Sequence, residues 1–200
     1  IDAVETKPTI TDSSQTIAPD TSQTFNITGT NFVSIPIVEF IKSDTGAITR
    51  ASAVGFTSST QLSITATLAS GTYYVRVENN DGNAARSTNA ILTASSAPSF
   101  STAAGSLGTV GAADTVSITV AASSDSNVTI TETTSVLTSN SDTPNSTMNL
   151  TLSGTPATSA SYTISGTAPS PSETKSYSFT LQAEDAEGQT TTRDFSIDVS

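Results

Sequence analysis

Residues 71–82 read Gly-Thr-Tyr-Tyr-Val-Arg-Val-Glu-Asn-Asn-Asp-Gly, and this stretch decides the fold. From Tyr73 to Val77 every second residue is a large apolar one, which is the pattern of a strand with one buried face. The Asp81-Gly82 step that follows tolerates the positive φ angles of a tight hairpin turn. We therefore predict a strand, a turn and a closing strand over Ala90–Thr93.

The same period of two recurs along the whole chain. In the first half the alternating pairs are Phe25 with Ile27, Val38 with Phe40, and Leu62 with Ile64. In the second half they are Val116 to Val120, Val128 with Ile130, Met148 to Leu152, Tyr162 with Ile164, Tyr177 to Ala183, and Phe195 to Val199. About seven short strands per half, separated by turn residues, are typical of a β-sandwich. Because helix-favouring residues are scarce, we expect an all-β protein.

A domain boundary is expected at Ala94–Pro98, a run of small residues that ends in a proline. Proline lacks the amide donor of a strand ladder and stiffens a connection. A length of 200 residues is also compatible with two small domains. We therefore predict one domain over 1–96 and a second over 97–200. Residues 138–147, rich in Ser, Thr, Asn and Asp, and residues 168–173 are expected to form exposed loops.

The first half resembles the IPT/TIG family of immunoglobulin-like domains. The resemblance is carried by Pro19, the run Ile27–Phe32, Val38 with Phe40, Thr60–Leu62, and Tyr73 to Gly82. Gly29 is expected to allow a sharp turn after a strand, so that Phe32 folds back onto the core. The resemblance implies an immunoglobulin-like sandwich over 1–96.

The second half is similar to the putative-Ig and cadherin-like modules of surface proteins. Its carriers are Pro98 with Phe100, Leu107-Gly108, Val116 to Val120, and the ending from Tyr177 to Ile197. Together the two resemblances imply two tandem immunoglobulin-like β-sandwich domains.

Composition excludes several classes of function. The formal net charge is −11, with 7 basic and 18 acidic residues, and the basic residues are scattered along the sequence. Binding to nucleic acid depends on clustered Lys and Arg, so we expect no nucleic-acid partner. No apolar run is long enough to span a membrane, so no membrane insertion is expected. The chain begins at Ile1 rather than Met, which we interpret as a processed product or a fragment.

Catalytic chemistry has few candidates in this sequence. There is no His and no Cys, so the usual nucleophile–base pairs are excluded, and we expect no enzyme and no cofactor. The cluster Glu184, Asp185 and Glu187 is the one candidate metal site, and hard cations such as calcium bind several carboxylate and carbonyl oxygens. Asn80 and Asp81 are candidates for further ligands. The competing and favoured interpretation is a charged loop tip that protects a sheet edge.

Two surface features have a bland and a functional interpretation. Asn26, Asn127, Asn145 and Asn149 each start a glycosylation sequon, which matters only in a host that glycosylates secreted proteins. Tyr73 and Tyr74 could stack on a sugar, but alternation buries one of two neighbours.

Tandem modules of these kinds resemble structural proteins of marine bacteriophages. The resemblance implies a non-enzymatic virion-surface module, a capsid decoration, head fibre or tail component, that acts in assembly or adhesion. The implied partners are neighbouring subunits in a multimeric assembly, and a host-surface glycan or protein. The alternative is a bacterial surface adhesin or extracellular filament segment, and a third interpretation is an accessory module of a secreted polysaccharide-degrading enzyme. These choices rest on analogy, since one fold hosts many functions.

Overall fold

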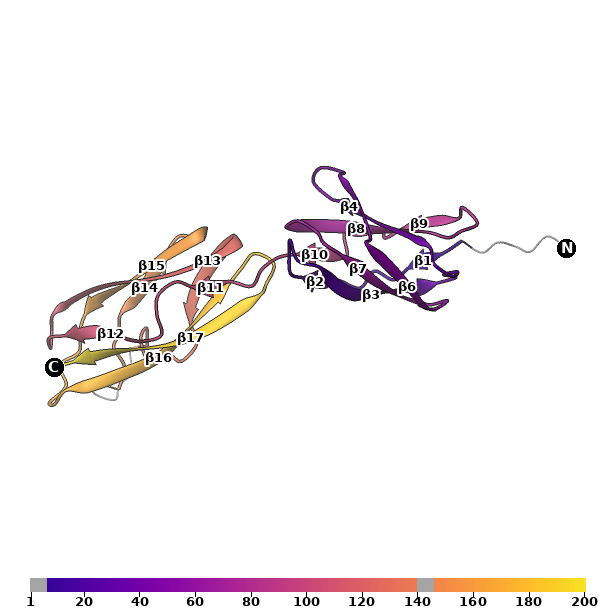
Figure 1. Ribbon diagram of the computed structural model, residues 1–200. Helices are drawn as coiled ribbons and strands as arrows, with labels where there is room; N and C mark the ends of the chain where they lie inside the picture. The colour runs from indigo at the N-terminus through magenta and orange to yellow at the C-terminus, as the bar shows by residue number, and fades with distance from the viewer. Residues whose placement is uncertain (1–6, 140–145) are drawn as a thin grey trace. The chain divides into compact units, whose positions relative to one another are not determined.

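The computed structural model describes residues 7–139 and 146–200. These residues contain strands and turns but no helix, and hence no helix able to cross a membrane. The chain divides into two compact units, Ile1–Ser96 and Ala97–Ser200. In Figure 1 the first unit runs from indigo to magenta and the second from magenta to yellow.

The described residues of the first unit form ten strands in two layers. Their bounds are β1 (Thr9–Ile10), β2 (Gln15–Ile17), β3 (Gln23–Thr30), β4 (Ile37–Lys42), β5 (Ile48–Arg50), β6 (Ala53–Ser58), β7 (Gln61–Ala66), β8 (Gly71–Glu78), β9 (Ala84–Arg86) and β10 (Leu92–Ala94). One sheet has the order β1-β3-β7-β6, and the other has the order β2-β10-β8-β4-β5 with β9 beside β8. With β2 and β10 parallel, these are the layers of an immunoglobulin sandwich.

The second unit repeats this plan, with seven strands in its described part. They are β11 (Ser99–Phe100), β12 (Gly105–Val110), β13 (Thr115–Glu132), β14 (Thr151–Gly154), β15 (Ala157–Thr167), β16 (Lys175–Glu184) and β17 (Thr190–Val199). The early strand β12 again pairs in parallel with the last strand, β17. Both units therefore close one sheet with the same parallel contact.

Strand β13 belongs to both layers of the second unit. Its first part, Thr115 to Ser123, pairs with β15, and its last part, Thr129 to Glu132, pairs with β16. The register shifts between Ser123 and Val128, where the strand changes layers. Strands that switch sheets at such a bend form the corners of sandwiches. The two strands expected around Val116 and Val128 are thus one bent strand.

Each core is a single layer of side chains from the alternating positions. Phe40, Leu62, Ile64 and Val75 are fully buried in the first unit. The predicted runs of the second unit, such as Tyr177 to Ala183, lie in its own cluster of buried residues. The all-β prediction is confirmed, because the alternating residues form strands whose apolar side chains face one shared core.

One local prediction of the first unit is confirmed in part and another was wrong. The segment Ala90–Thr93 overlaps β10, which does pair antiparallel with β8, but the Asp81-Gly82 turn leads first into the short strand β9, which also pairs with β8. Gly29 does not turn the chain. A side chain there would lie 2.0 Å from the Thr9 carbonyl oxygen and 2.6 Å from the Phe32 ring, so glycine is required by close packing. Phe32 does fold back onto the core, with 2% of its surface exposed.

Two buried tyrosines at matching places near the starts of β8 and β16 differ in one respect. The Tyr73 hydroxyl donates a hydrogen bond of 2.7 Å to the carbonyl oxygen of Ala69, four residues upstream. Such a bond is the tyrosine corner of immunoglobulin sandwiches. The Tyr177 hydroxyl has no hydrogen-bond partner within the described part of the chain, and burial raises its pKa.

We therefore expect opposite effects from the same substitution at these two positions. Tyr73→Phe removes a hydrogen bond and is expected to lower the free energy of unfolding by about 1 kcal/mol. Tyr177→Phe removes a buried, unpaired hydroxyl and is expected to leave stability unchanged or to raise it by up to about 1 kcal/mol. Urea unfolding of both full-length variants measures the difference. An equal loss of stability in the two variants would show that the Tyr177 hydroxyl is paired.

Candidate functional site

The acidic residues that lie together in the second unit are not the three that the sequence predicted. Oxygen atoms of Asp125, Asp185 and Glu187 lie within 4.8 Å of one another. Glu184, which was predicted to join them, is exposed at the end of β16, because neighbouring strand residues point to opposite faces. Asp125 comes from the bend of β13. Sequence reasoning missed it because a contact across 60 residues leaves no local pattern.

Asp185 organises this loop. Only 5% of its surface is exposed, and its Oδ1 accepts hydrogen bonds from the backbone amides of Glu187 at 3.1 Å and Gln189 at 2.7 Å. The Ser126 hydroxyl accepts a bond from the Ala186 amide and donates one to the Glu187 carboxylate. The cluster thus ties the β16–β17 turn to the bend of β13. A calcium ion at this loop stays a prediction.

The predicted additional ligands, Asn80 and Asp81, lie in the first unit, where their side chains make hydrogen bonds to nearby backbone groups. The Asp81 carboxylate accepts a hydrogen bond from the Asn83 amide at 2.9 Å. Asn80 donates its side-chain amide to the Ser34 carbonyl oxygen at 2.6 Å. Asp81 belongs to no cluster of three or more acidic residues in the described ranges.

The sequons and tyrosines also have definite places. Asn26, Asn127 and Asn149 are exposed, and Asn145 lies outside the described residues. Tyr73 is buried, whereas the ring of Tyr74 is half-buried and carries the guanidinium of Arg86 at 4.4 Å from its centroid. Of the two interpretations of this tyrosine pair, the one that buries one ring and leaves its neighbour partly accessible agrees with the structure.

Glu132, at the end of β13, is a second carboxylate with a structural task. Its two oxygens accept hydrogen bonds from the backbone amides of Val136, Leu137 and Thr138 at 2.6 to 2.9 Å. This holds the following segment so that Leu137 is fully buried. Residues 140–145 of the loop predicted at 138–147 lie outside the described residues, and the segment before them is anchored rather than uniformly exposed.

The hydrogen bonds decide the titration of Glu132. Partial burial acts to raise the pKa of its carboxyl, but the bonds from Leu137, Thr138 and Val136 together outweigh burial, so the pKa lies below its ordinary value of 4.5. A carboxylate with a lowered folded-state pKa contributes stability that is complete above its ordinary pKa. That contribution is lost as the pH falls through the lower, folded-state pKa.

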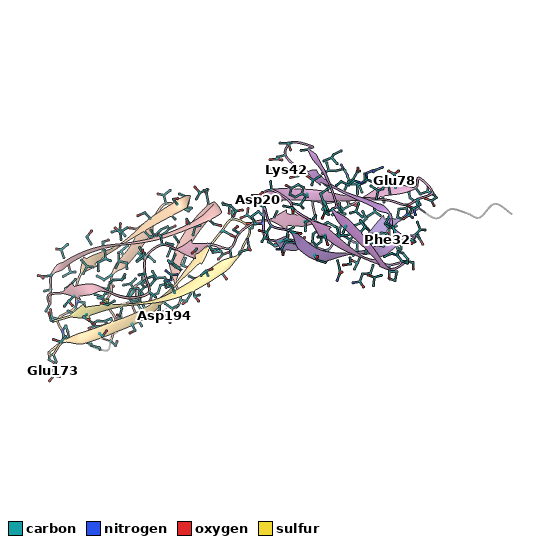
Figure 2. The ribbon with its side chains drawn as sticks, viewed as in Figure 1. Asp20, Phe32, Lys42, Glu78, Glu173 and Asp194 are labelled. Carbon is teal, nitrogen blue, oxygen red and sulfur yellow. The ribbon has the colours of Figure 1, made fainter. Side chains whose placement is uncertain are left out.

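A hollow of about 570 Å³ lies on the outer face of β16 and β17. Its floor includes Ser178, Thr180, Asp194 and Ser196, which alternate with buried residues of the two strands. Asp194 lies on this side of the second unit (Figure 2) and accepts a hydrogen bond of 2.7 Å from the Thr180 hydroxyl. The lining also includes Phe179 and Phe195, and Asp194 is its one charged residue, so the hollow is suited to a cationic group.

Comparison with known proteins identifies the fold of the chain but does not assign it to a family. No family model matches the chain, and no curated protein sequence matches it. Among solved structures, a three-domain immunoglobulin fragment of titin, an E-to-A variant, aligns with 96% of the chain at 14% identity and a TM-score of 0.50. Extracellular domains 3–5 of Drosophila OTK align with 97% of the chain at 13% identity and a TM-score of 0.51.

The chain has the immunoglobulin-like fold. It covers 65% of the titin fragment and 62% of the OTK fragment, and so spans less than two thirds of either. At these identities the likeness concerns architecture alone. The IPT/TIG and cadherin-like resemblances of the two halves stay predictions.

Substitution of Asp185 separates loop organisation from metal binding. In the presence of a chelator, Asp185→Ala is expected to lower the free energy of unfolding by about 2 kcal/mol, because two backbone amides lose their acceptor. Asp185→Asn keeps an acceptor oxygen and is expected to lose less. If the loop binds calcium, adding calcium raises the melting temperature of the native chain but not of Asp125→Asn. An unchanged melting temperature of the native chain removes the calcium hypothesis.

Glu132→Gln is expected to destabilise the chain by about 2 kcal/mol at neutral pH, because its amide group presents a donor to the Thr138 amide and hydroxyl. The difference from the native chain should shrink below pH 4.5, as the native carboxylate becomes protonated. Unfolding free energies measured across this pH range test the expectation. Glu173→Gln, at an exposed loop position, is the matched control and should show no such dependence. A difference that is constant with pH would contradict the role of the charge.

Proposed function

We propose that the chain is a non-enzymatic structural module of a virion surface, a capsid decoration, head fibre or tail component of a marine bacteriophage. Its work is assembly or adhesion through its outer sheet faces. Immunoglobulin-like sandwiches are typical of surface and adhesion modules, which is the general support for this role. The phage setting rests on the resemblance of tandem, hydroxyl-rich modules to virion proteins.

The observation that carries the proposal is a sheet face without charge in the second unit. The outward positions that pair across β11, residues 115–123 of β13, β15 and β14 hold twelve hydroxyl residues and one alanine. They are Ser99, Thr115, Ser117, Thr119, Ala121, Ser123, Thr151, Ser153, Ser159, Ser161, Thr163, Ser165 and Thr167. We call this the hydroxyl face. It contrasts with the ten acidic residues found elsewhere in residues 97–200.

The corresponding sheet of the first unit has the same character. Its outward positions on β1, β3 and β7 are Thr9, Thr24, Asn26, Thr28, Thr30, Gln61, Ser63 and Thr65. Hydroxyl and amide groups can exchange hydrogen bonds with a neighbouring subunit without like-charge repulsion. Faces of this kind therefore suit packing against other copies or subunits displayed at high density.

The proposal is tested by locating the chain. Particles and cell envelopes are purified separately from a culture that produces it, and the chain is quantified in each by mass spectrometry. We expect it in the particles at a fixed ratio to the major coat protein, exposed to added protease. Recovery from the cell envelope or from extracellular filaments alone would instead support the alternative, a bacterial adhesin or filament segment.

A further inference from the structure

The outer face of the other sheet in the first unit carries a row of arginines. Arg50 on β5, Glu39 on β4, Arg76 on β8 and Arg86 on β9 stand directly opposite one another across four neighbouring strands. The row holds three of the four arginines of the chain. They look scattered in the sequence because strand pairing, rather than sequence distance, brings them together.

The charges of this row are only partly balanced. Arg76 makes ion pairs with Glu39, at 2.8 Å, and with Glu78. Arg86 lies over the Tyr74 ring and is exposed, and exposed Arg50 has no ion pair among the described residues. Three positive charges therefore face two negative ones, which leaves a local excess of positive charge in a chain of net charge −11.

An apolar row runs beside the arginines. Ile48, Ile41 and Tyr74 are opposite one another on β5, β4 and β8, and Ile48 is 63% exposed. Arginine and tyrosine are enriched among the residues that dominate the binding energy of protein interfaces. We call these two rows together the arginine face, and its composition fits an acidic protein surface.

The second unit supplies such a surface. Residues 97–200 contain ten acidic and two basic residues. Of the two, Arg193 is engaged internally, because it donates to the carbonyl oxygens of Phe100 and Thr102 at 3.0 and 2.6 Å. Glu184, Asp194 and Asp198 all point outward from the β16–β17 pair, and Asp194 lies within the hollow, among hydroxyl residues of the two strands. A guanidinium group can hydrogen-bond to both a carboxylate and hydroxyl oxygens there.

We propose that the arginine face of one copy of the chain docks on the Asp194 hollow of a second copy. Each contact joins the arginine face of one copy to the hollow of another. The resulting pair still has one unoccupied arginine face and one unoccupied hollow. Head-to-tail contacts of this kind continue into rings or open chains. The inference concerns contact between copies and holds whether the carrier is a virion or a cell.

Sedimentation of the full-length chain tests the contact. At low ionic strength the average mass is expected to rise with concentration above the 20.3 kDa of one copy. Molar salt should reverse the rise, since it shortens the screening length to about 3 Å. A chain that stays monomeric at all concentrations in low salt overturns the proposal.

Two variants locate the surfaces. The double variant Arg50→Glu with Arg86→Glu should remain monomeric, and so should Asp194→Ala. All three positions lie on outer faces, and circular dichroism verifies folding of each variant. A 1:1 mixture of the two should form a dimer and nothing larger, because it contains one intact arginine face and one intact hollow. Lys7→Glu and Glu173→Ala, which change charge at exposed positions outside both surfaces, should associate like the native chain. Association that survives in either variant alone, or a mixture that stays monomeric, contradicts the assignment.

Discussion

The two layers of each sandwich share a single layer of apolar side chains, and the rest of the structure depends on this constraint. With 34% apolar residues, the chain can fill two such cores only by placing its large apolar side chains at alternating inward positions. Val33, Ile35, Ile48 and Phe56 are the exposed large hydrophobic residues of the described ranges, and all lie in the first unit. The outer faces are consequently polar almost throughout. Contacts made through these faces therefore rest mainly on hydroxyl, amide and charged groups, with the Ile48 row of the first unit as an apolar addition.

The chain has no cysteine, and buried polar side chains do the work of fixing its loops. Asn79, 2% exposed, accepts a hydrogen bond from the Val33 amide and donates one to the Asn31 carbonyl oxygen. Ser87 accepts from the Val75 amide and donates to the Asn89 carbonyl oxygen. Asp185 has the same part in the second unit. Each is buried and fully paired, so removing one leaves backbone groups unsatisfied at a cost of about 1–3 kcal/mol. In a sequence such residues resemble metal-binding groups, which explains why Asp185 was a candidate metal ligand beside the favoured interpretation of a charged loop tip.

Local periodicity predicted the strands because burial of alternate residues acts within a few positions. Contacts between distant segments left no such signal. The alternating apolar residues around Val116 and Val128 are compatible with one bent strand or with two separate strands. Only the pairing with β15 and β16 distinguishes the two possibilities. Glu184 and Asp185 look equivalent in sequence, yet the pleat sends them to opposite sides and brings in Asp125 from the bend of β13. Likewise, Arg50, Arg76 and Arg86 form a row only through the strand register.

Charge is sorted between the two sheets of each unit, and this sorting limits how copies can meet. The hydroxyl face excludes charge, while the opposite sheet of the second unit carries Glu184, Asp194 and Asp198, and that of the first carries the arginines. Two acidic surfaces repel at short range, so close contact between copies requires either a neutral face or opposed charges. The two kinds of contact respond differently to salt. Hydrogen bonds between neutral faces are little affected by screening, whereas an ionic contact weakens as the screening length falls below the size of the contact. A chain with both kinds of contact can keep the contact between neutral faces at high salt while the ionic contact dissociates. An assembly built from both would therefore separate at its ionic contacts first as the ionic strength rises.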